Sequence, residues 1–275
     1  KTSDLEDCEI IFLSQDVETD SKNKSNFYKI NSLLNNVVFK IKNKKTLLIL
    51  LSQVEPGFTR KINFDKERLF YQVETLIVGE SINSALYPKR LIIGCDKKGK
   101  ELPIKYRMVL EAFNCPILKM SYESAELSKI SINCYLASSV LMTNTLAEAS
   151  RAIGANWNDI ASALKLDPRI GEKAYLKPGL GISGGNLERD LISLIKLSKT
   201  NDFNEKLIQS LIETSNYHSK WILKELENKI FKFLSKPKIS ILGLTYKEGT
   251  ASIKNSPSIK IINSLSNYDL FYYDP

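Results

Sequence analysis

The chain has 275 residues and a formal net charge of +8, but its lysines are scattered or in short runs typical of solvated faces, so we expect no nucleic-acid partner. Hydrophobic residues make up 43%, enough for a core, and no apolar run is long enough to span a membrane, so a soluble globular protein is expected. Four irregularly spaced cysteines and one histidine argue against a metal site and a disulfide framework, and favour a reducing, cytoplasmic setting.

The first hundred residues alternate between strand and helix patterns. Residues 9–13 form a short β-rich run, and a helix is expected around residues 31–42. Residues 46–51 are apolar throughout, as in a parallel strand that is buried on both faces, and a turn follows at Pro56-Gly57. A further strand at 91–94 completes the pattern, which predicts a parallel α/β sheet.

The pattern becomes helical after about residue 121. We expect one long helix over 124–153 and a helical block over 190–233, separated by a loop at 167–189 that holds five of the twelve glycines. Strands are expected at 239–242 and 270–274, and Ser256-Pro257 should cap and start the helix between them. The chain thus reads as α/β, then helical, then the start of a second α/β region.

Five sequence blocks carry a family resemblance. Residues 52–59 read S-Q-V-E-P-G-F-T, 71–79 read Y-Q-V-E-T-L-I-V-G, and 125–133 read A-E-L-S-K-I-S-I-N. The glycine-rich block at 167–190 reads D-P-R-I-G … P-G-L-G-I-S-G-G-N-L-E-R-D, and the last reads G-L-T-Y-K … K-N-S-P, then Y-D-P. In this order and spacing the blocks resemble the UDP-glucose/GDP-mannose dehydrogenase family over nearly the whole chain. No single block would be specific.

The resemblance implies a domain order and a reaction. It implies an NAD-binding domain at 1–120, a helical dimerisation domain at 121–235 and the beginning of a UDP-sugar-binding domain at 236–275. The first and last would be Rossmann-like. The implied reaction is an NAD-dependent, two-step oxidation of the C6 alcohol of a nucleotide sugar, in a cytoplasmic homodimer that serves polysaccharide biosynthesis.

The resemblance also implies site residues. The implied catalytic positions are Lys129, Asn133, Asp190, Glu74 and Asn186. The implied cofactor contacts are Ser52, Val78, Arg189 and Lys254, and the implied substrate contacts are Leu76, Tyr175, Gly184 and Lys247. The residues alone leave simpler readings open, because Lys129 and Asn133 share a helix face at i and i+4 and could form a polar packing pair. Asp190 could be a helix N-cap, Tyr175 a packing residue, and His218 and Cys134 structural residues.

Several positions depart from the family pattern. Asn186 stands where the family has its nucleophilic Cys, and a carboxamide cannot form a thiohemiacetal or a thioester. Val78 replaces a Glu, Arg189 a Lys and Lys254 an Arg, while Asp16 and Glu18 place carboxylates where the family meets NAD. No G-x-G-x-x-G follows an early strand, so we expect a chain truncated at both ends that binds NAD poorly.

These departures leave two alternatives to an impaired dehydrogenase. One is a non-catalytic homologue that keeps the dimer core as a binding module. The other is a relative of the β-hydroxyacid and phosphogluconate dehydrogenases, which share the Lys-x-x-x-Asn pair. The Y-x-x-E and K … S-P blocks argue against the latter.

Overall fold

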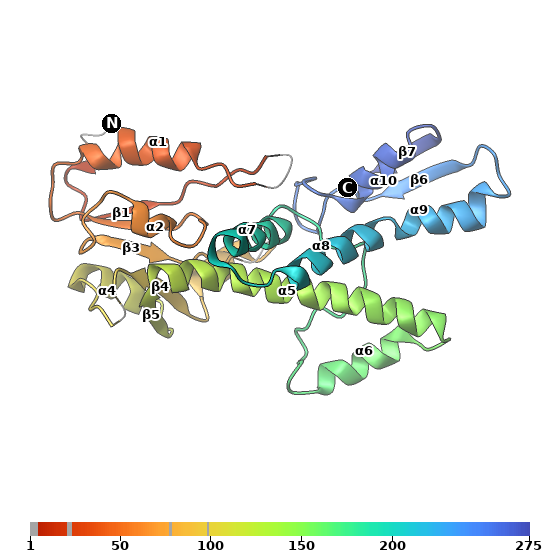
Figure 1. The fold of residues 1–275 in the computed structure, drawn as a ribbon, viewed down its shortest axis with the longest axis horizontal. Helices are drawn as coiled ribbons and strands as arrows, with labels where there is room; N and C mark the ends of the chain where they lie inside the picture. The colour runs from red at the N-terminus through yellow and green to blue at the C-terminus, as the bar shows by residue number, and fades with distance from the viewer. Residues whose placement is uncertain (1–4, 21–23, 77–78, 98) are drawn as a thin grey trace. The chain divides into compact units, whose positions relative to one another are not determined.

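The computed structural model describes residues 5–20, 24–76, 79–97 and 99–275. The chain divides into two compact units, residues 1–131 and 132–275 (Figure 1). The division falls within the helix α5 (Tyr122–Ala152), which therefore contributes residues to both units. The division into three domains predicted from the sequence stays a prediction.

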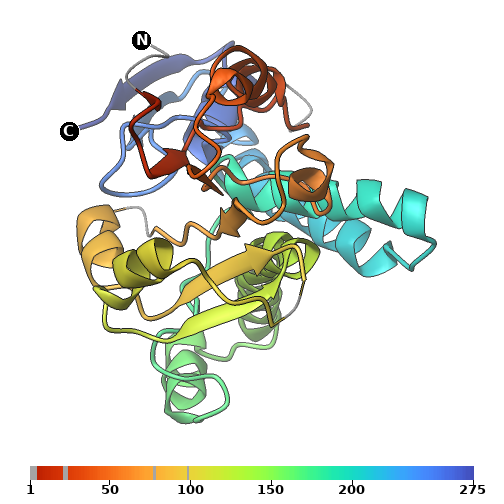
Figure 2. The same ribbon diagram turned by 90° about the vertical axis from the view of Figure 1, so that its left-hand side faces the viewer.

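The first unit is built on a five-stranded sheet (Figures 1 and 2). The strands follow the chain order β1 (Ile10–Leu13), β2 (Leu47–Leu50), β3 (Leu69–Gln72), β4 (Leu91–Cys95) and β5 (Ile117–Ser121). The pairs β1–β2, β2–β3 and β4–β5 are parallel, but β3 and β4 are antiparallel. The parallel α/β sheet expected from the sequence is thus present, with the β3–β4 pair as its antiparallel exception. The connection from β3 to β4 holds only the short helix α3 (Ser81–Leu86), which buries no residue and so is not a packed crossover helix.

Both faces of this sheet are covered by apolar side chains. Leu48 and Leu50 pack with the helix α1 (Tyr28–Asn36) and the start of α5, whereas Leu47 and Ile49 pack with the helix α4 (Ile104–Glu111). All four are at most 6% exposed, which confirms that residues 46–51 supply a strand buried on both faces. The helix expected over 31–42 is α1 followed by the 3₁₀ turn η2 (Val38–Lys40).

The second unit is mainly helical. It contains most of α5, then α6 (Trp157–Leu166), α7 (Asn186–Asn201), α8 (Lys206–Ser219), α9 (Trp221–Leu226) and the π-helical turn η3 (Glu227–Phe231). The long helix predicted over 124–153 is confirmed, but the predicted block at 190–233 is three helices and begins at residue 186. The break between α7 and α8 follows Asp202, the C-cap residue of α7, which has a φ of +48°.

The end of the chain forms a parallel strand pair. Strands β6 (Lys238–Leu242) and β7 (Asp269–Tyr273) flank the helix α10 (Pro257–Ser264), as the sequence predicts. Pro257 is the first helical residue and Ser256 holds the N-cap position in an extended conformation, as expected, but its side chain makes no cap hydrogen bond: its Oγ donates to the carbonyl of Leu244 at 2.6 Å. In the described ranges no helix has the length and apolarity that a membrane crossing requires.

Candidate active site

A buried polar cluster joins α5 to α7 within the second unit. Asn133 Nδ2 donates to Asp190 Oδ2 at 2.5 Å, and Arg189 Nε lies 3.3 Å from Asp190 Oδ1. Asn133, Arg189 and Asp190 are each at most 6% exposed. A buried carboxylate requires such partners, and the structure supplies a donor to each of its oxygens. Because α7 begins at Asn186, the reading of Asp190 as a helix N-cap was wrong.

Two further side chains of α5 lie close to Asn133 in the sequence. Lys129 is half-buried and precedes Asn133 by one helical turn, so the two share a helix face as the sequence predicts. Cys134 packs against the apolar core of the second unit, as expected for a structural cysteine. Burial, with the negative charge of Asp190, raises the pKa of the Cys134 thiol to about 12, so it stays protonated at neutral pH.

The glycine loop, residues 178–185, is anchored by side chains of two helices in this unit. Asn144 Oδ1 on α5 accepts from the backbone N–H of Gly179 at 2.8 Å, and Ser215 Oγ on α8 accepts from that of Ile182 at 2.9 Å. Asn144 is only 4% exposed. The loop that leads into Asn186 is therefore held by hydrogen bonds from its backbone N–H groups to two uncharged side chains.

Two of its glycines are required by close packing. Gly181 has a φ of +84°, and a Cβ there would lie 2.6 Å from the carbonyl oxygen of Ser215. Gly184 has a φ of +79°, and a Cβ there would lie 2.8 Å from the ring of Tyr246. Both the left-handed backbone and the lack of space exclude a side chain. At these two glycines the backbone therefore packs closely against Ser215 and Tyr246 of the same chain.

Other predicted residues of the second unit lie around this loop. Asn186 is the first residue of α7 and is exposed, and Lys254 packs its aliphatic carbons beside Gly185. Tyr175 is 50% exposed, and its carbonyl accepts from Thr143 Oγ1 at 2.7 Å. Lys247 is exposed beyond β6. The structure thus brings Gly184, Asn186 and Lys254 together at the entry to α7.

The predicted residues of the first unit lie where two neighbouring parallel strands end. Ser52 follows β2 and is buried, with Oγ 3.4 Å from the carbonyl of Leu13. Glu74 and Leu76 follow β3 and are exposed. Val78 lies outside the described residues. Carboxyl ends of parallel strands are where open α/β sheets bind ligands.

One buried charged residue near these positions was not predicted. Glu126 on α5 is 0% exposed and accepts from the backbone N–H groups of Gly57 at 2.5 Å and Thr59 at 2.8 Å. Burial raises its pKa, against the opposing effect of the hydrogen bonds that it accepts. The available signal was its place among buried residues of the α5 pattern, beside Ala125 and one turn from Tyr122 and Ile130.

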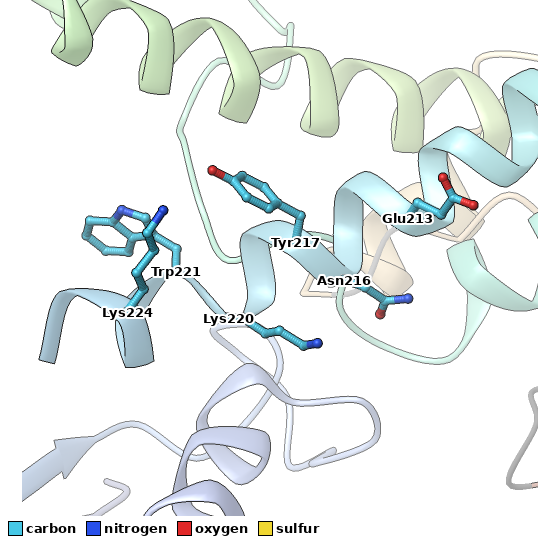
Figure 3. Close-up of a pocket in the computed structure, with 6 residues that line it drawn as sticks. All are labelled: Glu213, Asn216, Tyr217, Lys220, Trp221 and Lys224. Carbon is cyan, nitrogen blue, oxygen red and sulfur yellow. The ribbon is translucent and has the colours of Figure 1, made fainter. Parts of the chain in front are cut away.

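Two cavities lie away from the polar cluster. One, of about 480 Å³, is lined by α8 and α9 residues (Figure 3): Glu213, Asn216, Tyr217, Lys220, Trp221 and Lys224. Trp221 and Lys224 lie together there, while Lys220 points toward Asn216. The other, of about 450 Å³, opens at the carboxyl end of β1 and is lined by Ser14, Gln15 and Asp16 together with apolar residues.

His218 and the acidic residues of the described ranges form no metal centre. His218 is 6% exposed, and its Nε2 lies 3.4 Å from Thr145 Oγ1. Burial lowers its pKa, which fits a structural role. Nowhere in those ranges do three or more His, Cys, Asp or Glu side chains gather to hold a metal ion.

Known proteins share both the sequence and the fold. Residues 123–217 match the UDP-glucose/GDP-mannose dehydrogenase family, central domain. The UDP-glucose 6-dehydrogenase of Campylobacter jejuni is 32% identical over 94% of this chain and 65% of its own length. That of Rickettsia prowazekii is 30% identical over 85% of this chain and 56% of its own length. The chain thus spans between about half and two thirds of such relatives.

Solved structures confirm the fold class. A UDP-glucose dehydrogenase from the archaeon Pyrobaculum islandicum superposes with a TM-score of 0.87 at 20% identity, covering 100% of this chain and 66% of that one. A UDP-D-ManNAc dehydrogenase from Pyrococcus horikoshii gives 0.84 at 20% identity, covering 100% and 67%. Residues 123–217 therefore carry the central domain of the UDP-glucose/GDP-mannose dehydrogenase family, and ordered sequence blocks on either side of it resemble the same family.

Proposed function

We propose that this chain carries the site for oxidation of the C6 alcohol of a nucleotide sugar, and that the reaction stops at the aldehyde. The observation that carries the proposal is the buried hydrogen bond between Asn133 and Asp190, one turn after Lys129 on the same helix. Asp190 fixes the amide of Asn133, so that Asn133 can donate to the hydroxyl oxygen of the substrate and Lys129, as the neutral amine, can receive its proton. UDP-glucose is the first substrate to test, because the curated relatives are UDP-glucose 6-dehydrogenases.

The residues at the carboxyl ends of β1 and β2 fit a dinucleotide. The cavity after β1 lies at this edge, and the long 3.4 Å contact of Ser52 Oγ leaves that buried hydroxyl able to bond a ligand. Glu18, which would repel a phosphate, is paired with Lys29 at 2.5 Å. Ser52 would contact NAD at this edge of the sheet, and NAD when bound would accept a hydride from the alcohol carbon.

The second oxidation is where this chain departs from its family. A carboxamide at Asn186 offers no electron pair suited to attack the aldehyde carbon, so no covalent thioester route exists at this position. Cys134 does not replace the missing thiol, because its raised pKa keeps it protonated and it is packed in the core. The aldehyde is therefore the expected product.

Product analysis tests this proposal. The protein is incubated with NAD and UDP-glucose, UDP-N-acetylmannosamine or GDP-mannose, with a carbonyl-trapping amine, and products are identified by mass spectrometry. We expect trapped aldehyde and no uronic acid, and a rate of NADH formation lower by about 10²–10⁴-fold in Lys129→Ala. Asn186→Cys should still release no uronic acid, whereas Asn186→Cys with Val78→Glu is the variant expected to recover some.

Two outcomes would contradict the proposal in different ways. Uronic acid from the wild type would show that another nucleophile or direct oxidation of the aldehyde hydrate operates. The absence of NADH with every sugar nucleotide would favour the alternative, a non-catalytic binding module. The observation that favours this alternative is the exposed carboxamide of Asn186 at the position of the family's nucleophile.

We also propose that the chain forms a homodimer through α5. Three large apolar side chains of α5 are 43–79% exposed at spacings of seven and four residues, which places them on one helix face: Tyr135, Met142 and Leu146. Ile153, which is 82% exposed, follows directly after the end of the helix. A contiguous exposed apolar stripe is typical of an interface. Light scattering should give a dimer for the wild type and a monomer for Met142→Lys with Leu146→Glu. A monomeric wild type at micromolar concentration would contradict it.

The cellular setting is a smaller part of the same proposal. All four cysteines are free in the structure, which fits a reducing compartment such as the cytoplasm. Thiol titration of the denatured protein, purified without reductant, should find four thiols. Fewer would indicate disulfide formation.

A further inference from the structure

The strand-exit loop, residues 51–57, is tied to α5 by one buried carboxylate. Glu126 accepts from the backbone of Gly57 through Oε2 and from that of Thr59 through Oε1. These groups are separated from Glu126 by more than 60 residues of sequence, so the bonds fix tertiary structure. An ionised or polar group with no exposed surface is retained only where it is satisfied in this way.

The same stretch of α5 makes a second attachment one turn earlier. Arg60, in the short helix α2 (Phe58–Lys61), bonds both carboxylate oxygens of Glu123, at 2.8 and 3.1 Å. Glu123, Glu126 and Lys129 follow one another at intervals of three residues, so they lie along one side of the helix. The end of the strand-exit loop is therefore attached directly to the turns of α5 that precede Lys129.

We propose that Glu126 is a positioning residue for the dinucleotide. Its carboxylate holds the strand-exit loop, and with it Ser52, in the conformation that binds the cofactor, in register with the helix that carries Lys129. This inference rests on the proposed function for the identity of the ligand. Glu126 itself is covered by protein and touches neither substrate nor cofactor.

The residue type follows from the geometry. Two N–H donors meet two different oxygens, and only a carboxylate offers two acceptors. A glutamine would oppose its own NH₂ group to one of the donors, and an aspartate would be shorter by one methylene group. We therefore expect Glu126→Gln to lose one of the two hydrogen bonds to the backbone while keeping the size of the side chain.

The first test is hydrogen exchange, which needs no activity. In the wild type, the amides of Gly57 and Thr59 should exchange slowly although the loop is partly exposed. In Glu126→Gln, exchange of at least one of them should rise by about tenfold or more, since a hydrogen bond to a charged group is lost. Glu123→Gln is the matched control on the same helix: it removes a contact to a side chain and leaves both amides protected.

The second test is NAD affinity by calorimetry, without any sugar. Glu126→Gln should bind NAD about tenfold more weakly than the wild type, and Glu123→Gln, which leaves both backbone hydrogen bonds to Glu126 in place, should lose less affinity. In steady-state assays the KM for NAD should rise while the KM for the sugar nucleotide is unchanged. A residue that only stabilised the fold would lower the melting temperature and the active fraction but leave both KM values unchanged.

Several outcomes would overturn the inference. Rapid exchange of Gly57 and Thr59 in the wild type would show that the anchor does not form, and this measurement stands even if Glu126→Gln fails to fold. Unchanged NAD affinity in a folded Glu126→Gln would refute the positioning role, as would a wild type that binds no NAD. A wild type whose NAD affinity depends on Glu126 but that oxidises no sugar nucleotide would instead refute the proposed function alone.

Discussion

The strand-exit loop and the glycine loop are both anchored through backbone amides, the first to a side chain of α5 and the second to side chains of α5 and α8, but by different chemistry. The first depends on one buried carboxylate, Glu126, which accepts two N–H groups. The second depends on a neutral amide and a hydroxyl, Asn144 and Ser215, and on the space left by Gly181 and Gly184. The strand-exit loop is thus held by one charged group, whereas the glycine loop is held by several weaker contacts.

The difference predicts how each loop fails. Removing a charged acceptor leaves two donors without partners at once, and the strand-exit loop should loosen locally. The glycine loop loses little with any one hydrogen bond, because each contributes only about 1 kcal/mol. It is sensitive instead to added volume, because its backbone packs directly against Ser215 and the Tyr246 ring.

The largest effect should therefore come from adding one methyl group to the glycine loop. Gly181→Ala combines a φ of +84° with a Cβ only 2.6 Å from a backbone oxygen, and should lower the free energy of unfolding by about 3 kcal/mol. Gly171→Ala is the control, since its φ of +83° is similar but no atom lies within 4 Å; about 1 kcal/mol is expected. Equal losses in urea denaturation would show that backbone conformation, and not packing, limits this loop.

The next effect comes from giving the glycine loop the charged anchor of the other loop. Asn144→Asp keeps an acceptor for the Gly179 amide but buries a charge, and should cost about 2 kcal/mol at pH 7. Burial would raise the pKa of this carboxyl, so stability is recovered as the pH falls and the group protonates. Asn158→Asp, exposed in the first turn of α6, should cause no loss. A stable Asn144→Asp at pH 7 would remove the distinction between the two anchors.

The smallest effect is the pH dependence of the two α5 carboxylates. Burial raises the pKa of Glu126, so the folded state binds a proton on this carboxyl group more tightly than the unfolded state does. The stability that this protonation contributes is therefore lost as the pH rises through the pKa of the folded state. The unfolding free energy of wild type minus Glu126→Gln should thus increase, by about 1 kcal/mol or less, as pH falls from 7 toward 4.5.

Glu123 provides a control of opposite sign. The hydrogen bond from Arg60 lowers its pKa, so its contribution is present at neutral pH and is lost as pH falls through the folded pKa. The unfolding free energy of the wild type minus that of Glu123→Gln, measured by chemical denaturation, should therefore decrease as the pH falls. The same sign for both carboxylates would contradict the assignment of Glu126 as the desolvated one.

Local patterns predicted most of the elements and part of the site. The apolar runs at β2 and β4, the length of α5 and the Pro257 helix start follow from periodicity and backbone chemistry, which act over a few residues. The pairing of Lys129 with Asn133 on one face follows from helical spacing. The strands β3 and β5 were missed because four or five residues give too short a pattern.

The contacts between distant segments could not be predicted in this way. Asp190 looked like a helix cap, but the helix begins four residues earlier and its carboxylate meets Asn133 on α5. Ser256 stood in a cap position, but its hydroxyl bonds to Leu244. A side chain with two possible partners bonds to the one that folding brings within hydrogen-bond distance. The local sequence does not show which segments come that close.

The sequence by itself therefore determined the order of α/β, helical and α/β regions and the family, because both depend on residue types at fixed spacing along the chain. Only the tertiary structure decided that β3 and β4 run antiparallel, that Gly181 and Gly184 make room for Ser215 and Tyr246, and that Glu126 is an anchor. These depend on which segments burial brings together, since a hydrogen bond or a steric contact acts only over a few ångströms.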